Sequence, residues 1–453
     1  MLREAGYEEQ RVLEALGVAD DLELSEAGPV AHLRTGRLAT LAALFLAGAT
    51  VSGDAAEDAL GDLGDLGVLA RDPDGVRATL RIEEYAGLLI ASDRDDAHPA
   101  DDYVLEVGPS TREAASLTVR RPVDRALDAC SGSGLQALLL RGHAERVVGT
   151  EISPRAVDFA RFNAALNGID GIDWRLGNLL EPVEGETFGA VVCNPPFVIG
   201  PGDEPLYRDG RAPADELSRA VVTGAARLIH EGGFATVVCN WISNPDEPWH
   251  SPPERWLEGC GCDVLLLRLG THDALDYAAS WSSWVLDREG RSAYVAAVGR
   301  RRDHLLGLGA QAVTSGVVVL RRRTGPTWRR REELVLPPSG SASAQILRVF
   351  EAQDFLACHR DDGDLLDAVL EPAPGARLVR SARYVERSYE PRVAQFALDD
   401  RIGLDGRFPP AALPAVERLD GRQSLREALG DSAGETLQAL RELFARGFLG
   451  RCA

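Results

Sequence analysis

Short apolar runs alternate with amphipathic stretches between about residues 103 and 323. Runs such as Ala190–Cys193 are apolar at every position, which is typical of a strand covered on both faces. Stretches such as Glu216–Gly233 repeat apolar residues every three or four positions, which predicts a helix with one buried stripe. The predicted strands lie near Arg125–Cys130, Arg146–Thr150, Asp173–Leu176, Ala190–Cys193, Ala235–Asn240, Asp263–Leu269 and Val313–Leu320. This alternation predicts an α/β fold, a mostly parallel seven-stranded sheet with helices on both faces and ligands at the carboxyl ends of the strands.

The pattern changes on either side of this region, which predicts three domains, residues 1–100, 101–323 and 324–453. In the first, an apolar helix at Thr40–Gly48 precedes a hairpin that turns at Asp72–Gly75, an order typical of small helical, winged-helix-like modules. The polar stretch Ser92–Asp102 is the predicted linker. A second boundary is expected at Leu336–Gln345. The C-terminal α+β module ends in two short amphipathic helices within Ser424–Gly450, so it too could be winged-helix-like.

Composition limits the setting and the partners. The chain has 453 residues, is 45% hydrophobic and carries a formal charge of −21, and its basic residues are all arginine. It shows neither a signal peptide nor a span of about 20 apolar residues, so we expect a cytoplasmic protein without membrane contact. Seven scattered cysteines form no disulfide or zinc pattern, and no metal is predicted. The acidic charge argues against a large nucleic-acid binding surface. Arginines nevertheless cluster at Arg300–Arg302, Arg321–Arg323 and Arg329–Arg331. These clusters could form either a solvated face or a binding surface.

A strand, a glycine turn and a helix start follow one another at Ala126–Leu138, "ALDACSGSGLQAL". The run satisfies G-x-G-x-x-A, and Glu151 at the next strand end can accept two ribose hydroxyls, so a dinucleotide and S-adenosylmethionine both fit. Asp128, just before the turn, can face an ammonium or sulfonium group but would repel a pyrophosphate. Asn178, after the third strand, can contact an adenine edge. Both residues could instead serve only as turn residues.

The motifs "DACSGSG", "GTEIS", "GNLLEP" and "CNPPF", in this order, resemble motifs I to IV of class I S-adenosylmethionine-dependent methyltransferases. More narrowly, they resemble the Rossmann-like branch that carries [DN]-P-P-[FYW], which includes the release-factor glutamine methyltransferases. The resemblance covers about residues 103–323 and implies S-adenosylmethionine as cofactor. By position, the residues expected to bind it are Asp128, Ser131, Gly132 and Gly134 at the methionine part, Glu151 at the ribose, and Ile152 and Asn178 at the adenine.

The tetrapeptide Asn194-Pro195-Pro196-Phe197 directly follows an apolar strand, and its prolines must end the ladder and stiffen the backbone. In a methyltransferase it is predicted to be catalytic. The Asn194 side-chain oxygen and the Pro195 carbonyl can accept the two N–H protons of an amide or amine, which draws the nitrogen toward tetrahedral geometry. Phe197 offers a flat face for a planar acceptor.

The acceptor is expected to be a carboxamide nitrogen, such as that of glutamine in a protein. Glu204-Pro205, Asp209-Gly210 and Asp215 occupy places comparable to those in release-factor glutamine methyltransferases, although Arg211 stands where a second glycine is common. The tryptophan-rich segments Asn240–Trp256 and Ser280–Trp284 could wall the acceptor pocket or simply pack a lid. An adenine or guanine amine of RNA or DNA and a small molecule of specialised biosynthesis remain alternative acceptors. A nicotinamide-dependent oxidoreductase and a catalytically silent scaffold are the alternatives to a methyltransferase.

Overall fold

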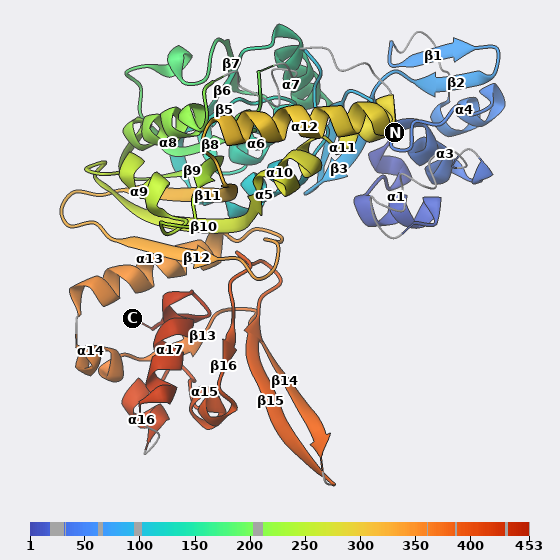
Figure 1. Ribbon diagram of the computed structural model, residues 1–453. Helices are drawn as coiled ribbons and strands as arrows, with labels where there is room; N and C mark the ends of the chain where they lie inside the picture. Colours follow the sequence, from blue (N-terminus) through green and yellow to red (C-terminus); the bar gives the residue numbers. More distant parts are fainter. Residues whose placement is uncertain are drawn as a thin grey trace. The chain divides into compact units, whose positions relative to one another are not determined.

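The computed structural model describes residues 1–18, 31, 33–61, 67–94, 102–202, 212–359, 361–385, 387–430 and 434–452 (Figure 1). Most of the predicted linker, and the Glu204-Pro205 and Asp209-Gly210 pairs, lie outside these residues. The chain divides into two compact units. The first holds Met1–Thr111, Ala126–Glu184 and Gly202–Arg211, and the second holds Arg112–Arg125, Gly185–Pro201 and Ala212–Ala453.

The largest sheet has eight strands in the order β12-β10-β11-β9-β8-β5-β6-β7. Their bounds are β5 Val123–Ala129, β6 Ala144–Glu151, β7 Ile172–Leu176, β8 Phe188–Cys193, β9 Ile229–Ser243, β10 Cys262–Asp273, β11 Ala312–Arg322 and β12 Arg329–Glu333. The pairs β6–β7, β8–β9 and β10–β12 are parallel, whereas β11 runs antiparallel to both β9 and β10. All seven predicted strands are confirmed. The predicted number of seven was wrong, because the arginine-rich β12 adds an eighth strand.

In the first unit, the N-terminal module packs helices against two hairpins. Its helices are α1 Glu9–Leu16, α3 Arg37–Phe45 and α4 Gly53–Leu60, and its strands are β1 Leu69–Asp72, β2 Gly75–Ala78, β3 Arg81–Tyr85 and β4 Leu88–Ser92. The antiparallel pairing of Asp72 with Gly75 confirms the predicted turn. Buried residues such as Leu41, Leu44 and Ile82 form one core, on which Phe159 of helix α7 (Pro154–Leu166) also packs.

In the second unit, helix α8 (Glu216–Leu228) buries Val221, Val222 and Ala225 of its predicted stripe. The remaining helices of this part are α5 Pro109–Leu117, which begins in the first unit, α9 Ser251–Trp256, α10 Ala274–Trp281, α11 Ser283–Glu289 and α12 Arg291–Gly307. Helices α10 to α12 form an insertion between β10 and β11 (Figure 1). Within the described ranges, no helix combines the length and the apolar character needed to cross a membrane.

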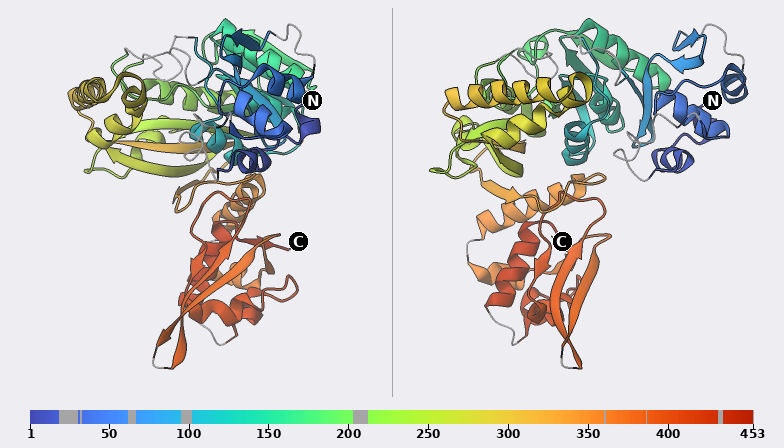
Figure 2. Two further views of the ribbon diagram at one scale, coloured as in Figure 1. Left: turned by 90° about the vertical axis from the view of Figure 1, so that its right-hand side faces the viewer. Right: turned by 45° about the vertical axis from the view of Figure 1, so that its right-hand side comes forward.

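The C-terminal module, also in the second unit, combines helices with two small sheets (Figure 2). Its helices are α13 Ser343–Cys358, α14 Asp362–Asp367, α15 Leu413–Val416, α16 Leu425–Leu429 and α17 Glu435–Ala445. Its strands are β13 Leu370–Pro372, β14 Arg377–Val385, β15 Ser388–Ala397, β16 Arg407–Phe408 and β17 Leu449–Arg451. Helices α16 and α17 confirm the two predicted helices at the end of the chain.

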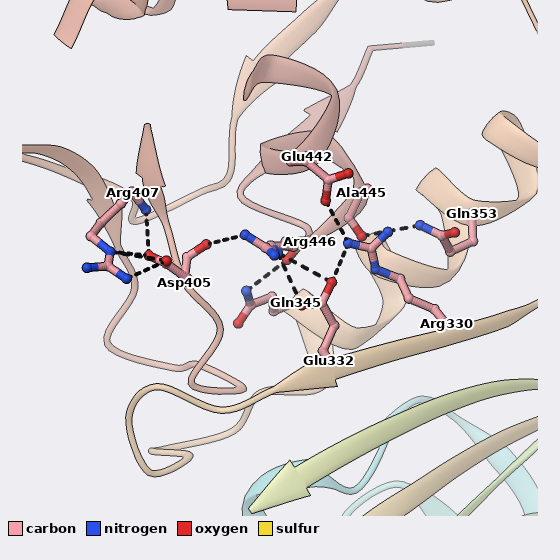
Figure 3. A network of polar contacts seen from close by, with 9 residues as sticks. All are labelled: Arg330, Glu332, Gln345, Gln353, Asp405, Arg407, Glu442, Ala445 and Arg446. Carbon is pink, nitrogen blue, oxygen red and sulfur yellow. Dashed lines mark hydrogen bonds and ion pairs between the residues drawn. The ribbon is translucent and has the colours of Figure 1, made fainter. Parts of the chain in front are cut away.

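Polar contacts join β12 to the C-terminal module (Figure 3). Glu332 of β12 accepts from Arg446 at 3.2 Å, and Arg330 donates to Glu442 at 3.1 Å. Arg446 also donates to the Asp405 carbonyl at 3.2 Å. The predicted arginine cluster is therefore largely engaged in holding the chain together, since Arg321 likewise binds the carboxylates of Asp263 and Asp354. These guanidinium groups are poor candidates for a nucleic-acid surface.

Candidate active site

The glycine turn between β5 and helix α6 (Leu135–Arg141) has the backbone shape that a ligand pocket requires. Gly132 and Gly134 have φ values of 51° and 85°, a region that glycine adopts without strain. A Cβ on Gly134 would lie 2.9 Å from the side chains of Ala160 and Trp174, so only glycine fits there. A Cβ on Gly132 would meet no atom within 4 Å, which leaves its backbone open to a ligand.

The carboxyl group of Asp128 is buried with one oxygen available for a ligand. Its Oδ2 accepts the Ala137 N–H at 2.9 Å, while its buried Oδ1 accepts no hydrogen bond within the described residues. Burial raises the pKa of Asp128 to about 7, because the charged form is desolvated. The Ser131 hydroxyl donates to the Asp128 carbonyl at 3.0 Å and fixes the start of the turn. An ammonium group would satisfy Oδ1 and stabilise the charged form.

Glu151, at the end of β6, is held by backbone donors. Its Oε2 accepts the Gly132 N–H at 2.9 Å, and its Oε1 accepts those of Ile152 and Ser153 at 2.8 and 2.9 Å. Both acceptor positions of Oε1 are taken, whereas Oε2 keeps one, so the carboxylate can accept one hydroxyl and not the predicted two while these bonds hold. Ile152 is 45% exposed and offers an apolar face beside it. The contacts of Glu151 and Ile152 to the ribose and adenine of S-adenosylmethionine stay predictions.

Asn178 has a local partner in the structure. Its Nδ2 donates to Glu181 Oε1 at 3.0 Å, which closes the turn after β7. The contact to an adenine edge stays a prediction. Its side-chain oxygen would have to make that contact, since an amide oxygen can only accept.

Sequence reasoning missed Asn163 of α7, whose side chain connects the glycine turn to β4. It is fully buried, and its Nδ2 donates to the carbonyls of Ser133 and Ala91, each at 2.9 Å. Its Oδ1 accepts the Ala91 N–H at 2.7 Å. The N-terminal module thereby supports the loop that holds Gly132 and Gly134. An asparagine within a helix of mixed polarity gave no sequence signal for this role.

Replacing Asn163 by alanine is expected to weaken both the fold and cofactor binding. Three buried backbone groups lose their partner, so the free energy of unfolding should fall by about 3 kcal/mol. Asn167→Ala is the matched control, since Asn167 pairs with Leu89 of the same strand but not with the glycine turn. Urea unfolding should show losses in both variants, and calorimetry should show weaker S-adenosylmethionine binding only for Asn163→Ala. Equal affinities in the two variants would contradict the supporting role.

In the second unit, the tetrapeptide Asn194–Phe197 directly follows strand β8, Phe188–Cys193, which is buried at all six positions. Pro195 is buried, whereas Asn194 and Phe197 are half-buried. The Phe197 ring meets the Trp281 ring edge to face, with centroids 5.9 Å apart. Trp281, from the second predicted tryptophan segment, therefore lies beside the tetrapeptide. Trp241 is instead a core residue, because it is fully buried and donates through Nε1 to the Trp249 carbonyl at 2.6 Å.

The hydroxyl of Tyr277 connects the loop after the tetrapeptide to β9. It accepts the Ile199 N–H at 3.0 Å and the Asn240 Nδ2 at 2.9 Å, and both Tyr277 and Asn240 are fully buried. The Asn240 Oδ1 is also buried and accepts no hydrogen bond in the described part of the chain. A buried amide oxygen without a donor costs free energy, so it is a candidate ligand contact. One sequence signal existed, since "VVCN" occurs at both Val191–Asn194 and Val237–Asn240.

Replacing Tyr277 by phenylalanine tests this connection. The ring can keep its contact with Trp281, but the N–H groups of Ile199 and Asn240 lose their acceptor. We expect the free energy of unfolding to fall by about 1–3 kcal/mol. The control is Tyr294→Phe in the same insertion, whose hydroxyl makes a single contact of 3.5 Å to the Ala279 carbonyl. Equal midpoints of thermal denaturation in the two variants would mean that the hydrogen bonds of the Tyr277 hydroxyl do not stabilise the fold.

Asp215, whose place in the sequence is comparable to one in release-factor glutamine methyltransferases, also binds β9. Its Oδ2 accepts the Ile242 N–H at 3.1 Å, and burial raises the pKa of its carboxyl group. Among the described residues, no group of three or more His, Cys, Asp or Glu side chains is placed to hold a metal ion.

Comparison with known proteins identifies the class. Residues 114–245 match the profile of the family described as "Methyltransferase small domain". The chain is 40% identical over 91 residues to a ribosomal protein uL3 glutamine methyltransferase of Bordetella pertussis, which is 19% of this chain and 30% of that protein. It is 31% identical over 118 residues to a ribosomal RNA small subunit methyltransferase C of Klebsiella pneumoniae, covering 26% of this chain and 31% of the relative.

A third relative is a release factor glutamine methyltransferase of Mycolicibacterium smegmatis, 31% identical over 156 residues, or 29% of this chain and 55% of that protein. The chain thus spans about a third to a half of the length of these relatives. Residues 114–245 thus match a methyltransferase small domain, a class that uses S-adenosylmethionine. The matched segment contains every predicted site residue from Asp128 to Phe197 and favours a methyltransferase over a nicotinamide oxidoreductase.

Proposed function

We propose that this protein transfers the methyl group of S-adenosylmethionine to a carboxamide nitrogen, with glutamine in a protein as the favoured acceptor. The observation that carries the proposal is the Asn194-Pro195 pair at the end of the fully buried strand β8. Two of the three relatives described above are named as glutamine methyltransferases, which supports the carboxamide.

The donor would be held by the glycine turn after β5 and by the end of β6. When bound, S-adenosylmethionine supplies an electrophilic methyl group, which the acceptor nitrogen takes with loss of one proton to water and release of the thioether. Asp128 Oδ1 would bind the ammonium group, which gives this buried oxygen a partner. Glu151 would accept one ribose hydroxyl through the position on Oε2 that its backbone donors leave open.

The acceptor would be held by the tetrapeptide after β8 and by β9. A carboxamide nitrogen is a poor nucleophile because its lone pair is conjugated with the carbonyl. Asn194 Oδ1 and the Pro195 carbonyl would accept its two N–H groups and favour the tetrahedral nitrogen that forms in the reaction. Asn240 adds a further candidate acceptor, since its Oδ1 is buried without a donor in the described residues. Phe197, braced by Trp281, would stack on the planar amide.

A base amine of RNA is the second candidate acceptor, because one relative is named as a ribosomal RNA methyltransferase. It presents the same chemistry, a planar nitrogen with two N–H groups. A transfer assay with methyl-labelled S-adenosylmethionine decides between them. The purified protein is added to an extract of cells that lack its gene, and the label is measured in the protein, RNA and small-molecule fractions. Protease-sensitive label in the protein fraction supports the carboxamide, whereas ribonuclease-sensitive label would replace it with the base amine.

A further inference from the structure

The hairpin formed by β14 and β15 extends beyond the other elements of the C-terminal module (Figures 1 and 2). Its strands pair from Arg377–Ala397 to Val385–Ser388, but the third strand, β16, reaches only Ala394 and Gln395. From Ser381 toward the turn the ribbon is therefore two-stranded, and its described side chains are mostly exposed. An isolated two-stranded hairpin is only marginally stable. Stability alone therefore does not explain the length of this hairpin.

Several arginines and two tyrosines lie along this hairpin. The segment 376–397 has a net charge of +3, whereas the whole chain has a formal charge of −21. It contains two glutamates and five arginines, Arg377, Arg380, Arg383, Arg387 and Arg392. Tyr384 and Tyr389 face each other across the two strands, with ring centroids 5.1 Å apart. Their side chains are 62% and 72% exposed, which is unusual for large aromatic residues that bind no other molecule.

The arginines of the hairpin remain available to a ligand. Arg377, Arg380 and Arg392 form ion pairs with Asp399, Glu417 and Glu390, but their side chains are more than half exposed. Exposed pairs contribute only about 0–1 kcal/mol, so a phosphate can compete for these guanidinium groups. Arg383 forms no ion pair within the part of the chain that the structure describes.

We propose that the β14–β15 hairpin binds single-stranded RNA. Bases stack on exposed aromatic rings, and guanidinium groups bind the phosphates between them. The tyrosine pair with arginines along both strands provides these two contacts on one ribbon. RNA suits it better than DNA, because RNA loops present unstacked bases whereas DNA is mostly paired. The inference goes beyond the proposed methyl transfer and does not depend on which acceptor is methylated.

The test is fluorescence anisotropy with the full-length protein and a labelled 12-nucleotide single-stranded RNA of mixed sequence. We expect saturable binding that weakens as salt rises, and about tenfold weaker binding for each of Tyr384→Ala and Tyr389→Ala. Phenylalanine at both positions should restore binding, because it keeps the rings. Arg383→Ala should weaken binding and reduce the salt dependence. Arg422→Ala, an exposed arginine of the same module outside the hairpin, is the matched control and should bind as wild type.

Three results would overturn the proposal. One is the absence of saturable binding by the wild-type protein. The second is an equal loss of affinity in Arg422→Ala and Arg383→Ala, which would mean that any exposed arginine contributes equally to RNA binding. The third is displacement of the RNA by a glutamate-rich peptide of equal charge at the same concentration, which would show that the hairpin binds acidic protein instead. Because the readout is binding, an absent methyl transfer activity would not alter any of these outcomes.

Discussion

Replacing Asn194 by alanine is expected to reduce methyl transfer by about 10²–10³-fold, the usual cost of removing one preorganised hydrogen-bonding group from an active site. The residue leaves a strand whose six positions are all buried, and a proline follows it, so its side chain starts from a fixed backbone. The lost acceptor would contact the nitrogen and not the cofactor. S-adenosylmethionine should therefore bind with nearly unchanged affinity, as calorimetry can show.

The companion variant Asn194→Asp separates the hydrogen bond from the shape of the site. A carboxylate still accepts an N–H group, so this variant should keep more transfer activity than Asn194→Ala in the labelled-methyl assay. Wild-type turnover in the alanine variant would refute the catalytic role. Equal loss in both variants would show that the amide group as a whole, including its N–H groups, is needed.

Replacing Asp128 by asparagine is expected to weaken S-adenosylmethionine binding by at least about thirtyfold, because removing one partner of a buried charge pair costs about 2–5 kcal/mol. The variant keeps the size of the side chain, removes its charge and replaces one acceptor oxygen with an NH2 group, while the remaining oxygen can still accept the Ala137 N–H. The matched control is Asp173→Asn, which neutralises an exposed aspartate of β7 in the same unit. Calorimetry should show an unchanged affinity for that control. Unchanged affinity in Asp128→Asn would place the ammonium group elsewhere.

The same carboxyl group predicts a pH dependence. Burial raises the pKa of Asp128 to about 7, so below that pH it is mostly protonated and has no charge to pair with an ammonium group. The affinity for S-adenosylmethionine should therefore rise as pH increases from about 5.5 to 7, by up to tenfold per unit, and level off above about 8. Asp128→Asn should lose this dependence. A flat profile in the wild-type protein would exclude ionised Asp128 as the ammonium partner.

The strands of the large sheet could be predicted because buried parallel strands are continuously apolar, a pattern confined to a few neighbouring residues. Strand β12 was missed for the same reason. Its sequence, Arg329–Glu333, is entirely charged, and among the described strands it pairs only with β10, at the edge of the sheet, where charged side chains are tolerated. Its arginines were expected to form a solvated face or a binding surface, and the structure shows Arg330 paired with Glu442 of the C-terminal module and Arg331 paired with Glu254.

By itself the sequence determined the class of the protein, since the order of its glycine turn, Glu151 and Asn-Pro-Pro-Phe is read directly from neighbouring residues. Only the tertiary structure revealed the groups that hold these motifs in place. Asn163 pairs with Ala91, 72 residues away, and Tyr277 with Ile199, 78 residues away. Such hydrogen bonds leave no periodic trace, because a single polar residue in a helix looks the same whether it faces solvent or a buried backbone group. The fold decides which of these it does.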